Sequence, residues 1–201
     1  MIKAITFDLD GVYFINGKSN FITSLGKLGV SEAEAKRVFL QSDEMNRLYK
    51  TGQMTDEQFW SWAVSEWKLD KSPQEVINLL ISGYEVDEDV VKVVKKAKEL
   101  GYKNLICTNN FPARINGLNE RFEFLENFDA WVFSYEVGTT KPDKKIFEEL
   151  VDKSGVAANE IVFADDSEKN IRGAQEVGIN AFFYENFEQF MRELGRMGVR
   201  I

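Results

Sequence analysis

Short apolar runs recur along the chain, separated by stretches in which apolar residues repeat every three or four positions. β-Branched and aromatic residues dominate these runs and turn-forming residues bound them, which is typical of buried strands. The runs predict strands at residues 2–7, 103–107, 130–134, 161–164 and 180–184. The intervening stretches predict helices, and strands that alternate with helices indicate an α/β fold with helices on both faces of a parallel sheet.

Three amphipathic stretches in the second half of the chain predict helices that cover this sheet. Residues 87–100 repeat apolar positions on one face and end at Gly101, a common helix stop. Two further helices, over residues 143–154 and 167–177, have the same pattern.

The segment from residue 15 to residue 83 interrupts the alternation of strands and helices. It contains no convincing strand, and Trp60 and Trp67 lie on an apolar stripe typical of the core of a helix bundle. Its apolar spacing predicts helices at residues 21–28, 32–40, 56–67 and 73–81. We expect residues 15–83 to form a helical cap over the sheet, whose core then comprises residues 1–14 and 84–201.

Polar side chains follow four of the predicted strands, at the point where each strand ends. They are Asp8 and Asp10, Thr108, Lys141, and Asp165 with Asp166. Because the carboxyl ends of parallel strands meet at one edge of a sheet, where ligands of such folds bind, we expect these side chains to share one crevice.

Composition narrows the chemistry available in that crevice. The 201 residues include 44% hydrophobic positions, enough for a sizeable core, and no apolar run long enough to cross a bilayer. The net charge of −8 argues against a nucleic-acid partner, and the absence of histidine excludes histidine bases and metal ligands. The single cysteine, Cys107, cannot form an internal disulfide, which favours a cytoplasmic location.

Carboxylates, a lysine and a hydroxyl suffice for phosphoryl transfer, which needs mainly positioning and charge neutralisation. Asp8 is the candidate nucleophile at phosphorus. Asp10, on the same side of the strand, could protonate the leaving group and later accept a proton from water. The first of these roles requires a raised pKa, which we expect from a neighbouring carboxylate in a closed site.

The remaining strand-end groups are candidates to bind the metal and the substrate. Asp165 and Asp166 complete, with the first acidic pair, a set of oxygen ligands suited to Mg²⁺. Thr108 and Asn109 are placed to bind phosphoryl oxygens, and Lys141 supplies a fixed positive charge to the same oxygens. Arg114 lies in the loop after the second strand and is a candidate substrate ligand.

These motifs resemble those of the haloacid dehalogenase superfamily of phosphohydrolases. That family has, in order, a strand ending in Asp-x-Asp, a strand ending in Thr or Ser, a Lys, and a strand ending in an acidic pair. The resemblance spans the whole chain and implies a Rossmann-like core, an inserted helical cap, and magnesium-dependent transfer through a phosphoaspartate. The Thr108 and Asp166 segments are similar to those of small sugar-phosphate phosphatases and of the N-terminal phosphatase-like domain of bifunctional epoxide hydrolases.

The resemblance also implies individual roles. Asp8 matches the nucleophile and Asp10 the acid/base, whose backbone carbonyl also binds the metal. Asp166 matches the direct metal ligand, and Asp165 acts on the metal through water. Asn170, where many members have Asp, matches a second-shell position that orients Lys141 or a metal-bound water. The acid at position 10 favours phosphate chemistry, because dehalogenases of the family lack it.

Three functions remain open at this stage. The first is a phosphatase acting on a small phosphorylated metabolite, such as a sugar phosphate, and the second is a phosphomutase with the same residues. The third is a phospho-acceptor or binding module without turnover, which the order of the motifs and the helical insertion disfavour. The substrate and the oligomeric state are open, and so are the cap residues that set specificity, for which Lys18, Arg47 and Lys50 are candidates.

Overall fold

Five parallel strands form the central sheet of the computed structural model, which describes all 201 residues. Their order across the sheet is β5 (Ala130–Phe133), β4 (Lys103–Thr108), β1 (Ala4–Phe7), β6 (Ile161–Asp165) and β7 (Asn180–Phe183). Every neighbouring pair is parallel. The predicted strands are therefore confirmed, with ends that differ by at most two residues.

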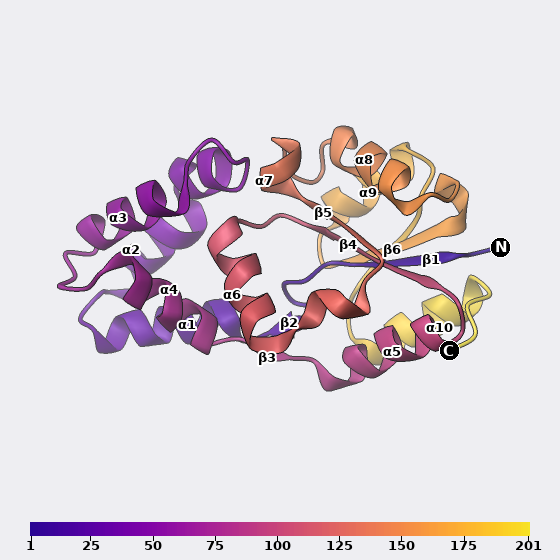
Figure 1. Cartoon of the computed structure of the whole chain (residues 1–201), viewed down its shortest axis with the longest axis horizontal. Helices are drawn as coiled ribbons and strands as arrows, with labels where there is room; N and C mark the ends of the chain where they lie inside the picture. The colour runs from indigo at the N-terminus through magenta and orange to yellow at the C-terminus, as the bar shows by residue number, and fades with distance from the viewer.

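Helices cover both faces of this sheet, so the predicted α/β class is confirmed (Figure 1). One face carries α8 (Lys144–Ser154) and α9 (Glu168–Glu176), and the other carries α5 (Glu88–Glu99) and α10 (Phe187–Arg196). We did not predict α10 from the sequence, although its apolar residues are spaced as in an amphipathic helix.

Successive side chains of each strand point to opposite faces of the sheet, and this divides the core into two apolar layers. Phe7 of β1 packs against Phe190 of α10, with ring centroids 5.9 Å apart. On the opposite face Phe163 of β6 meets Phe147 of α8 at 5.6 Å. Both layers are buried, which leaves the carboxyl ends of the strands as the polar edge of the sheet.

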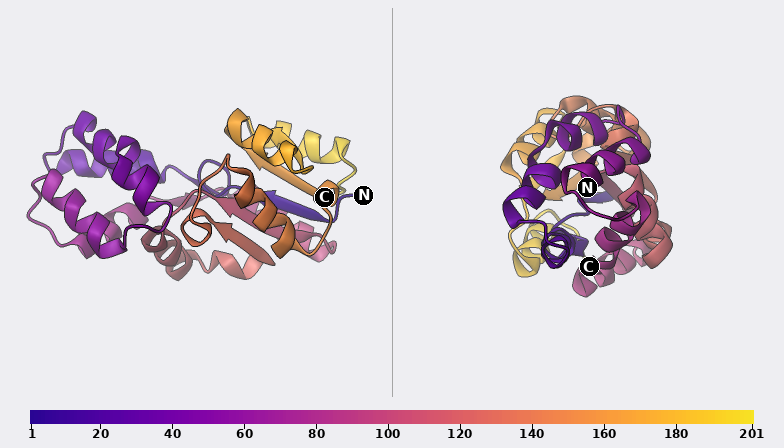
Figure 2. Two further views of the ribbon diagram at one scale, coloured as in Figure 1. Left: turned by 90° about the horizontal axis from the view of Figure 1, so that it is seen from above. Right: turned by 90° about the vertical axis from the view of Figure 1, so that its left-hand side faces the viewer.

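The inserted segment forms a separate group of helices beyond the carboxyl ends of the strands (Figures 1 and 2). It contains α1 (Gly17–Lys27), α2 (Glu32–Lys36), α3 (Asp56–Glu66) and α4 (Pro73–Ser82), with π-helical segments at Arg37–Gln41 and Glu44–Tyr49. The predicted helix over residues 32–40 is thus half π-helical, and the second π-helical segment was not predicted. Trp60 and Trp67 are buried in this group, as expected.

The two chain segments that connect this group to the sheet pair with each other. They form an antiparallel ribbon of β2 (Phe14–Ile15) and β3 (Glu85–Val86), which the sequence did not indicate because two-residue strands have no periodicity. The ribbon lies next to the boundaries that we predict at residues 15 and 83, and we retain that division as a proposal.

Two further helices follow β4 and β5 and were also not predicted. They are α6 (Pro112–Phe122) and α7 (Ser134–Val137), so Arg114, which we expected in a loop, lies on a helix. α6 packs closely on α4 at Gly117, which has no side chain. A Cβ added there would lie only 2.6 Å from the side chain of Ile81. None of the helices in the structure is both long and apolar enough to cross a membrane.

Candidate active site

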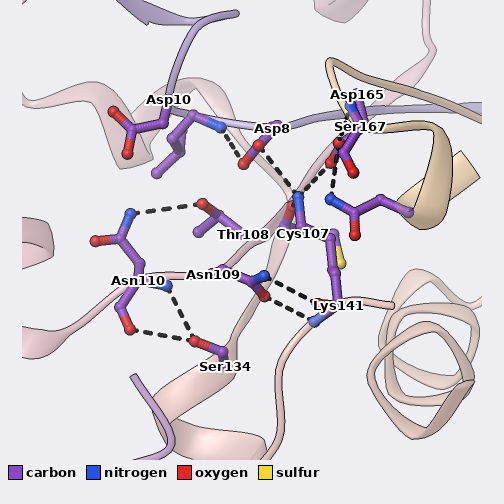
Figure 3. A network of polar contacts seen from close by, with 12 residues as sticks. Asp8, Asp10, Cys107, Thr108, Asn109, Asn110, Ser134, Lys141, Asp165 and Ser167 are labelled. Carbon is purple, nitrogen blue, oxygen red and sulfur yellow. Dashed lines mark hydrogen bonds and ion pairs between the residues drawn. The ribbon is translucent and has the colours of Figure 1, made fainter. Parts of the chain in front are cut away.

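Lys141 lies at the centre of the polar edge of the sheet (Figure 3). Its Nζ is buried and lies 3.2 Å from Asp8 Oδ2 and 2.5 Å from Asp165 Oδ2. The same ammonium donates a hydrogen bond to the Cys107 carbonyl at 2.9 Å. These contacts bring together the ends of β1, β4 and β6, so the predicted convergence of the strand-end residues is present in the structure.

Asp8 ends β1 in a buried position and faces this lysine. Burial and the negative charge of Asp165 raise the pKa of Asp8 to about 6, although Lys141 opposes the shift. Its Oδ1 accepts a hydrogen bond from the Leu9 amide at 2.8 Å. Thr108 is also buried, at the end of β4, and its hydroxyl favours the ionised form of the Asp8 carboxyl.

Three carboxylates form a compact acidic group at this edge. Asp8, Asp165 and Asp166 each offer an oxygen, and these oxygens lie within 4.8 Å of one another. Burial and the charge of Asp165 raise the pKa of Asp166. Gly11, at a φ of 80°, makes room for Asp166, whose Oδ2 would lie 3.2 Å from a Cβ there. Hard oxygen donors that repel one another fit a divalent cation such as Mg²⁺.

Both oxygens of Asp165 are already occupied by protein donors. Oδ2 contacts Lys141, and Oδ1 accepts hydrogen bonds from the Ser167 amide at 2.9 Å and from Asn170 Nδ2 at 2.8 Å. Asn170 therefore contacts neither Lys141 nor the crevice directly, and it orients the lysine through Asp165. Each oxygen of Asp8 has one donor, the Leu9 amide or Lys141, and Asp166 pairs with no donor of the chain, so both residues keep oxygen lone pairs that can face a cation.

Asn109 holds the backbone of Lys141. Its Nδ2 donates to the Lys141 carbonyl at 3.1 Å, and its Oδ1 accepts from the Lys141 amide at 2.7 Å. A side-chain amide can form both hydrogen bonds with a peptide group, because each group presents an N–H donor and a C=O acceptor. The Asn109 side chain is therefore held by the backbone of Lys141, and the binding of phosphoryl oxygens by Thr108 and by amides of Asn109 stays a prediction.

The Asp10 carboxylate points away from the acidic group. Its Oδ2 lies 2.6 Å from Arg114 Nη1 and 3.0 Å from Lys18 Nζ, and its Oδ1 accepts from the Tyr84 hydroxyl at 3.3 Å. Burial acts to raise the pKa of Asp10, but Arg114 and Lys18 outweigh it and lower the pKa to about 2. Our expectation of a raised pKa is therefore wrong for this structure, because it considered neighbouring acids and missed these two cations.

Arg114 is fully buried, and the protein itself satisfies its guanidinium. Its Nε donates to Asn110 Oδ1 at 2.6 Å, Nη1 to the Tyr84 hydroxyl at 2.8 Å, and Nη2 to the Asn109 carbonyl at 3.3 Å. The predicted substrate ligand thus faces Asp10. We missed Asn110 and Tyr84 in the sequence. Asn110 could have been noticed two residues after Thr108, but nothing near Tyr84 in the sequence indicates its contact.

The three basic candidates of the inserted helices have different positions. Lys18 of α1 pairs with Asp10, and Lys50 lies close enough for its charge to interact with both Asp8 and Asp10. Arg47 pairs with Asp43 at 3.2 Å on the surface, where its side chain is 77% exposed. The structure therefore brings Lys18 and Lys50 to the site and leaves Arg47 outside it.

A sizeable cavity lies elsewhere. It has a volume of about 930 Å³ between α3, α4 and α6, and none of the strand-end residues lines it. The arrangement of charged groups around Lys141, rather than cavity size, therefore locates the site.

Comparison with known proteins agrees with this arrangement. A family model described as haloacid dehalogenase-like hydrolase matches residues 2–178. Because the match covers most of the chain, the protein belongs to the haloacid dehalogenase-like hydrolase family. The predicted family and the predicted class, a hydrolase, are confirmed.

Relatives and solved structures extend this result. A crystal structure of a HAD family enzyme from Bacteroides thetaiotaomicron, in complex with magnesium and inorganic phosphate, has a TM-score of 0.80 at 23% identity and covers 96% of this chain and 100% of that one. At that identity the likeness shows the fold, and it confirms the Rossmann-like core.

Two relatives match along almost the whole chain. The D-ribitol-5-phosphate phosphatase of Bacteroides thetaiotaomicron is 23% identical over 96% of this chain and 97% of its own length. Bifunctional epoxide hydrolase 2 of Sus scrofa is 21% identical over 100% of this chain, which corresponds to only 40% of that protein.

Proposed function

We propose that the protein is a magnesium-dependent phosphatase that hydrolyses a small phosphorylated metabolite through a phosphoaspartate on Asp8. The observation that carries this proposal is the Asp8 carboxylate, which lies 3.2 Å from a buried lysine and beside two further acids. The similarity to a D-ribitol-5-phosphate phosphatase supports a sugar phosphate as the substrate class.

Asp8 is the nucleophile in the first step. One of its oxygens bonds to phosphorus, and the ester oxygen of the substrate leaves with the electrons of the broken bond. Lys141 and the Thr108 hydroxyl stabilise the negative charge of the phosphoryl oxygens during this transfer. Water then attacks the phosphoaspartate, releasing phosphate and restoring the Asp8 carboxylate.

Asp10 moves protons in both steps. In the structure it is a carboxylate, held so by Arg114 and Lys18, and this form suits the second step, in which it accepts a proton from the attacking water. Protonation of the leaving oxygen in the first step requires a higher proton affinity. We therefore infer that its ion pairs weaken when substrate is bound.

Mg²⁺ fits the donors at this edge. Asp8 and Asp166 would hold it directly, with the Asp10 backbone carbonyl. Asp165, whose oxygens accept hydrogen bonds from the protein, would act on the cation through water. When bound, the cation supplies charge that draws the phosphate to the acids and neutralises the phosphoryl oxygens.

The inserted helices complete the proposal. We assign residues 15–83 as a cap that closes over the crevice and excludes water from it. The buried, unpaired Cys107 agrees with the reducing cytoplasm, which we propose as the compartment.

A panel of phosphorylated metabolites, assayed with Mg²⁺, tests this function. We expect release of inorganic phosphate from at least one sugar phosphate and loss of that activity in EDTA. Activity that is unchanged in EDTA contradicts the metal assignment. Conversion of glucose 1-phosphate to an isomeric phosphate without phosphate release would identify a phosphomutase instead.

A further inference from the structure

Lys50 is a half-buried cation for which the chain provides no anion. It follows the π-helical segment Glu44–Tyr49, and its Nζ donates one hydrogen bond, to Asn46 Oδ1 at 2.9 Å. The lysines and arginines that are not highly exposed are Lys36, Lys50, Arg114 and Lys141. The other three have a carboxylate within 4.0 Å, whereas Lys50 has none.

Asn46 orients the ammonium, and a close backbone approach nearby places the segment that carries it. Asn46 Nδ2 donates to the Leu40 and Ser42 carbonyls at 2.9 and 3.1 Å, which leaves Oδ1 to orient Lys50. Two residues further on, Gly52 lies against the core, where an added Cβ would be 2.3 Å from the Tyr135 carbonyl. The lysine is therefore held by the cap at the point where the cap meets the sheet.

Its surroundings are predominantly positive. Burial, Arg114 and Lys18 lower the pKa of Lys50 to about 8, and only Asp10 and Asp8 act in the opposite direction. Asp10 is already paired with Arg114 and Lys18, and Asp8 with Lys141. Removing part of the water around a charge without supplying a partner lowers stability, and we take this as a sign that an external anion pairs with the half-buried Lys50.

We propose that Lys50, with Lys18 beside it, binds a second anionic group of the substrate, so that the enzyme acts on small phosphomonoesters that also carry a carboxylate or another phosphate. This inference rests on the proposed phosphatase function and adds a substrate class to it. Arg114 is a poorer candidate for the main ligand, because contacts within the chain occupy most of its donors. The Lys18 side chain is 45% exposed, so the subsite is open to solvent on that side.

Matched pairs of phosphomonoesters test this subsite. Glycerol 3-phosphate and 3-phosphoglycerate differ mainly in a carboxylate, and glucose 1-phosphate and glucose 1,6-bisphosphate differ in a second phosphate. We expect a higher kcat/KM for the charged member of at least one pair, and the pair with the larger preference identifies the anion. Lys50→Met should lower kcat/KM for that member by roughly 10- to 100-fold, as for a lost hydrogen bond between charged groups, and change the neutral member less than about threefold.

Control variants separate this effect from folding and from net charge. Arg47→Met removes a nearby exposed cation of the cap and should leave the preference unchanged, and Lys50→Arg should retain most of it. Lys50→Met should melt at the same or a higher temperature than the unchanged protein, because it removes an unpaired, half-buried charge. Isothermal titration of Asp8→Asn with the same pairs measures the difference in Kd without turnover.

Two outcomes would overturn the subsite while leaving a phosphatase in place. One is hydrolysis of both members of each pair with equal kcat/KM. The other is an equal loss on charged and neutral members in Lys50→Met, which would assign Lys50 to the transferred phosphate. A protein that hydrolyses no phosphomonoester with Mg²⁺ would refute the proposed function itself, and the subsite with it.

Discussion

Asp8 and Asp10 are two residues apart, yet they lie in regions of opposite charge. Asp8 belongs to a group of three carboxylates, two of which pair with one lysine, and the pKa of Asp8 is raised to about 6. Around Asp10, the cations Arg114 and Lys18 outnumber a single carboxylate, and the pKa of Asp10 is lowered to about 2. One turn of the chain thus joins an acidic region that suits a cation to a basic region that suits an anion.

The two regions also differ in which parts of the chain build them. The ends of three strands of one sheet supply the acidic region. The basic region takes Lys18 and Lys50 from the inserted helices, and Tyr84 from the segment that leads back to the sheet. Movement of the inserted helices would therefore change the surroundings of Asp10 and leave those of Asp8 largely intact.

The largest expected effect is on the acidic region. Asp8→Asn should lower the rate of phosphate release by roughly 1,000-fold or more, because no other group can form the phosphoaspartate. Circular dichroism should show an unchanged fold, and Asp152→Asn on the exposed face of α8 is the matched control. Near-normal turnover in Asp8→Asn would refute the nucleophile assignment.

Removing the lysine at the centre of the acidic region should lower stability most. Lys141→Met leaves Asp8 and Asp165 buried without a cation, and we expect the free energy of unfolding to fall by about 3–5 kcal/mol. Urea denaturation in EDTA measures this loss, with the exposed Lys145→Met as control. A change below about 1 kcal/mol would show that the lysine does not hold the acids together.

A smaller effect is expected in the basic region. Arg114→Lys keeps the charge but loses the planar contacts to Asn110 and Tyr84, which should lower the free energy of unfolding by about 1–3 kcal/mol. Weaker pairing should raise the pKa of Asp10, so the acidic limb of the pH–rate profile moves to higher pH. An unchanged pH–rate profile would show that Arg114 does not set the pKa of Asp10 during catalysis.

The smallest effect is a thermal shift that depends on pH. The pKa of Asp8 is raised from 3.8 to about 6, so its contribution to stability in the metal-free protein is present below about pH 4 and lost as the pH rises through 6. Protons therefore compete with Mg²⁺ for Asp8 below pH 6. Mg²⁺ should raise the melting temperature more at pH 7.5 than at pH 5, and Asp8→Asn should weaken this difference. Equal shifts at both pH values would contradict the acidic region as a metal site.

Helices and strands whose apolar residues repeat at regular spacing were predictable from the sequence, and short or irregular elements were not. The five strands and α5, α8 and α9 follow from apolar runs and from one-sided spacing. The β2–β3 ribbon has two residues per strand, and the π-helical segments depart from the α-helical period, so neither leaves a pattern to recognise. For α10 the amphipathic spacing is present in the sequence, so this helix was predictable as well.

The same division applies to the candidate site. The meeting of Asp8 and Asp165 could be predicted, because parallel strands end at one edge and each acid lies at the end of a strand. Lys141, which we placed at a strand end as well, lies beyond α7 and reaches the same edge through the connection from α7 to α8. The partners of Asp10 could not be predicted, since Tyr84 is 74 residues away and reaches the carboxylate only through the folding back of the inserted helices.

The order of residues along the chain by itself determined the sheet, its polar edge and the groups that gather there. Tertiary structure alone decided which way each side chain faces: that Asn109 holds a backbone, that Arg114 pairs with Asp10, and that Lys50 has no anion. The physical reason is that strand direction places backbones, and apolar periodicity records that placement. Charge pairing depends on distances of a few ångströms between segments that no local pattern relates.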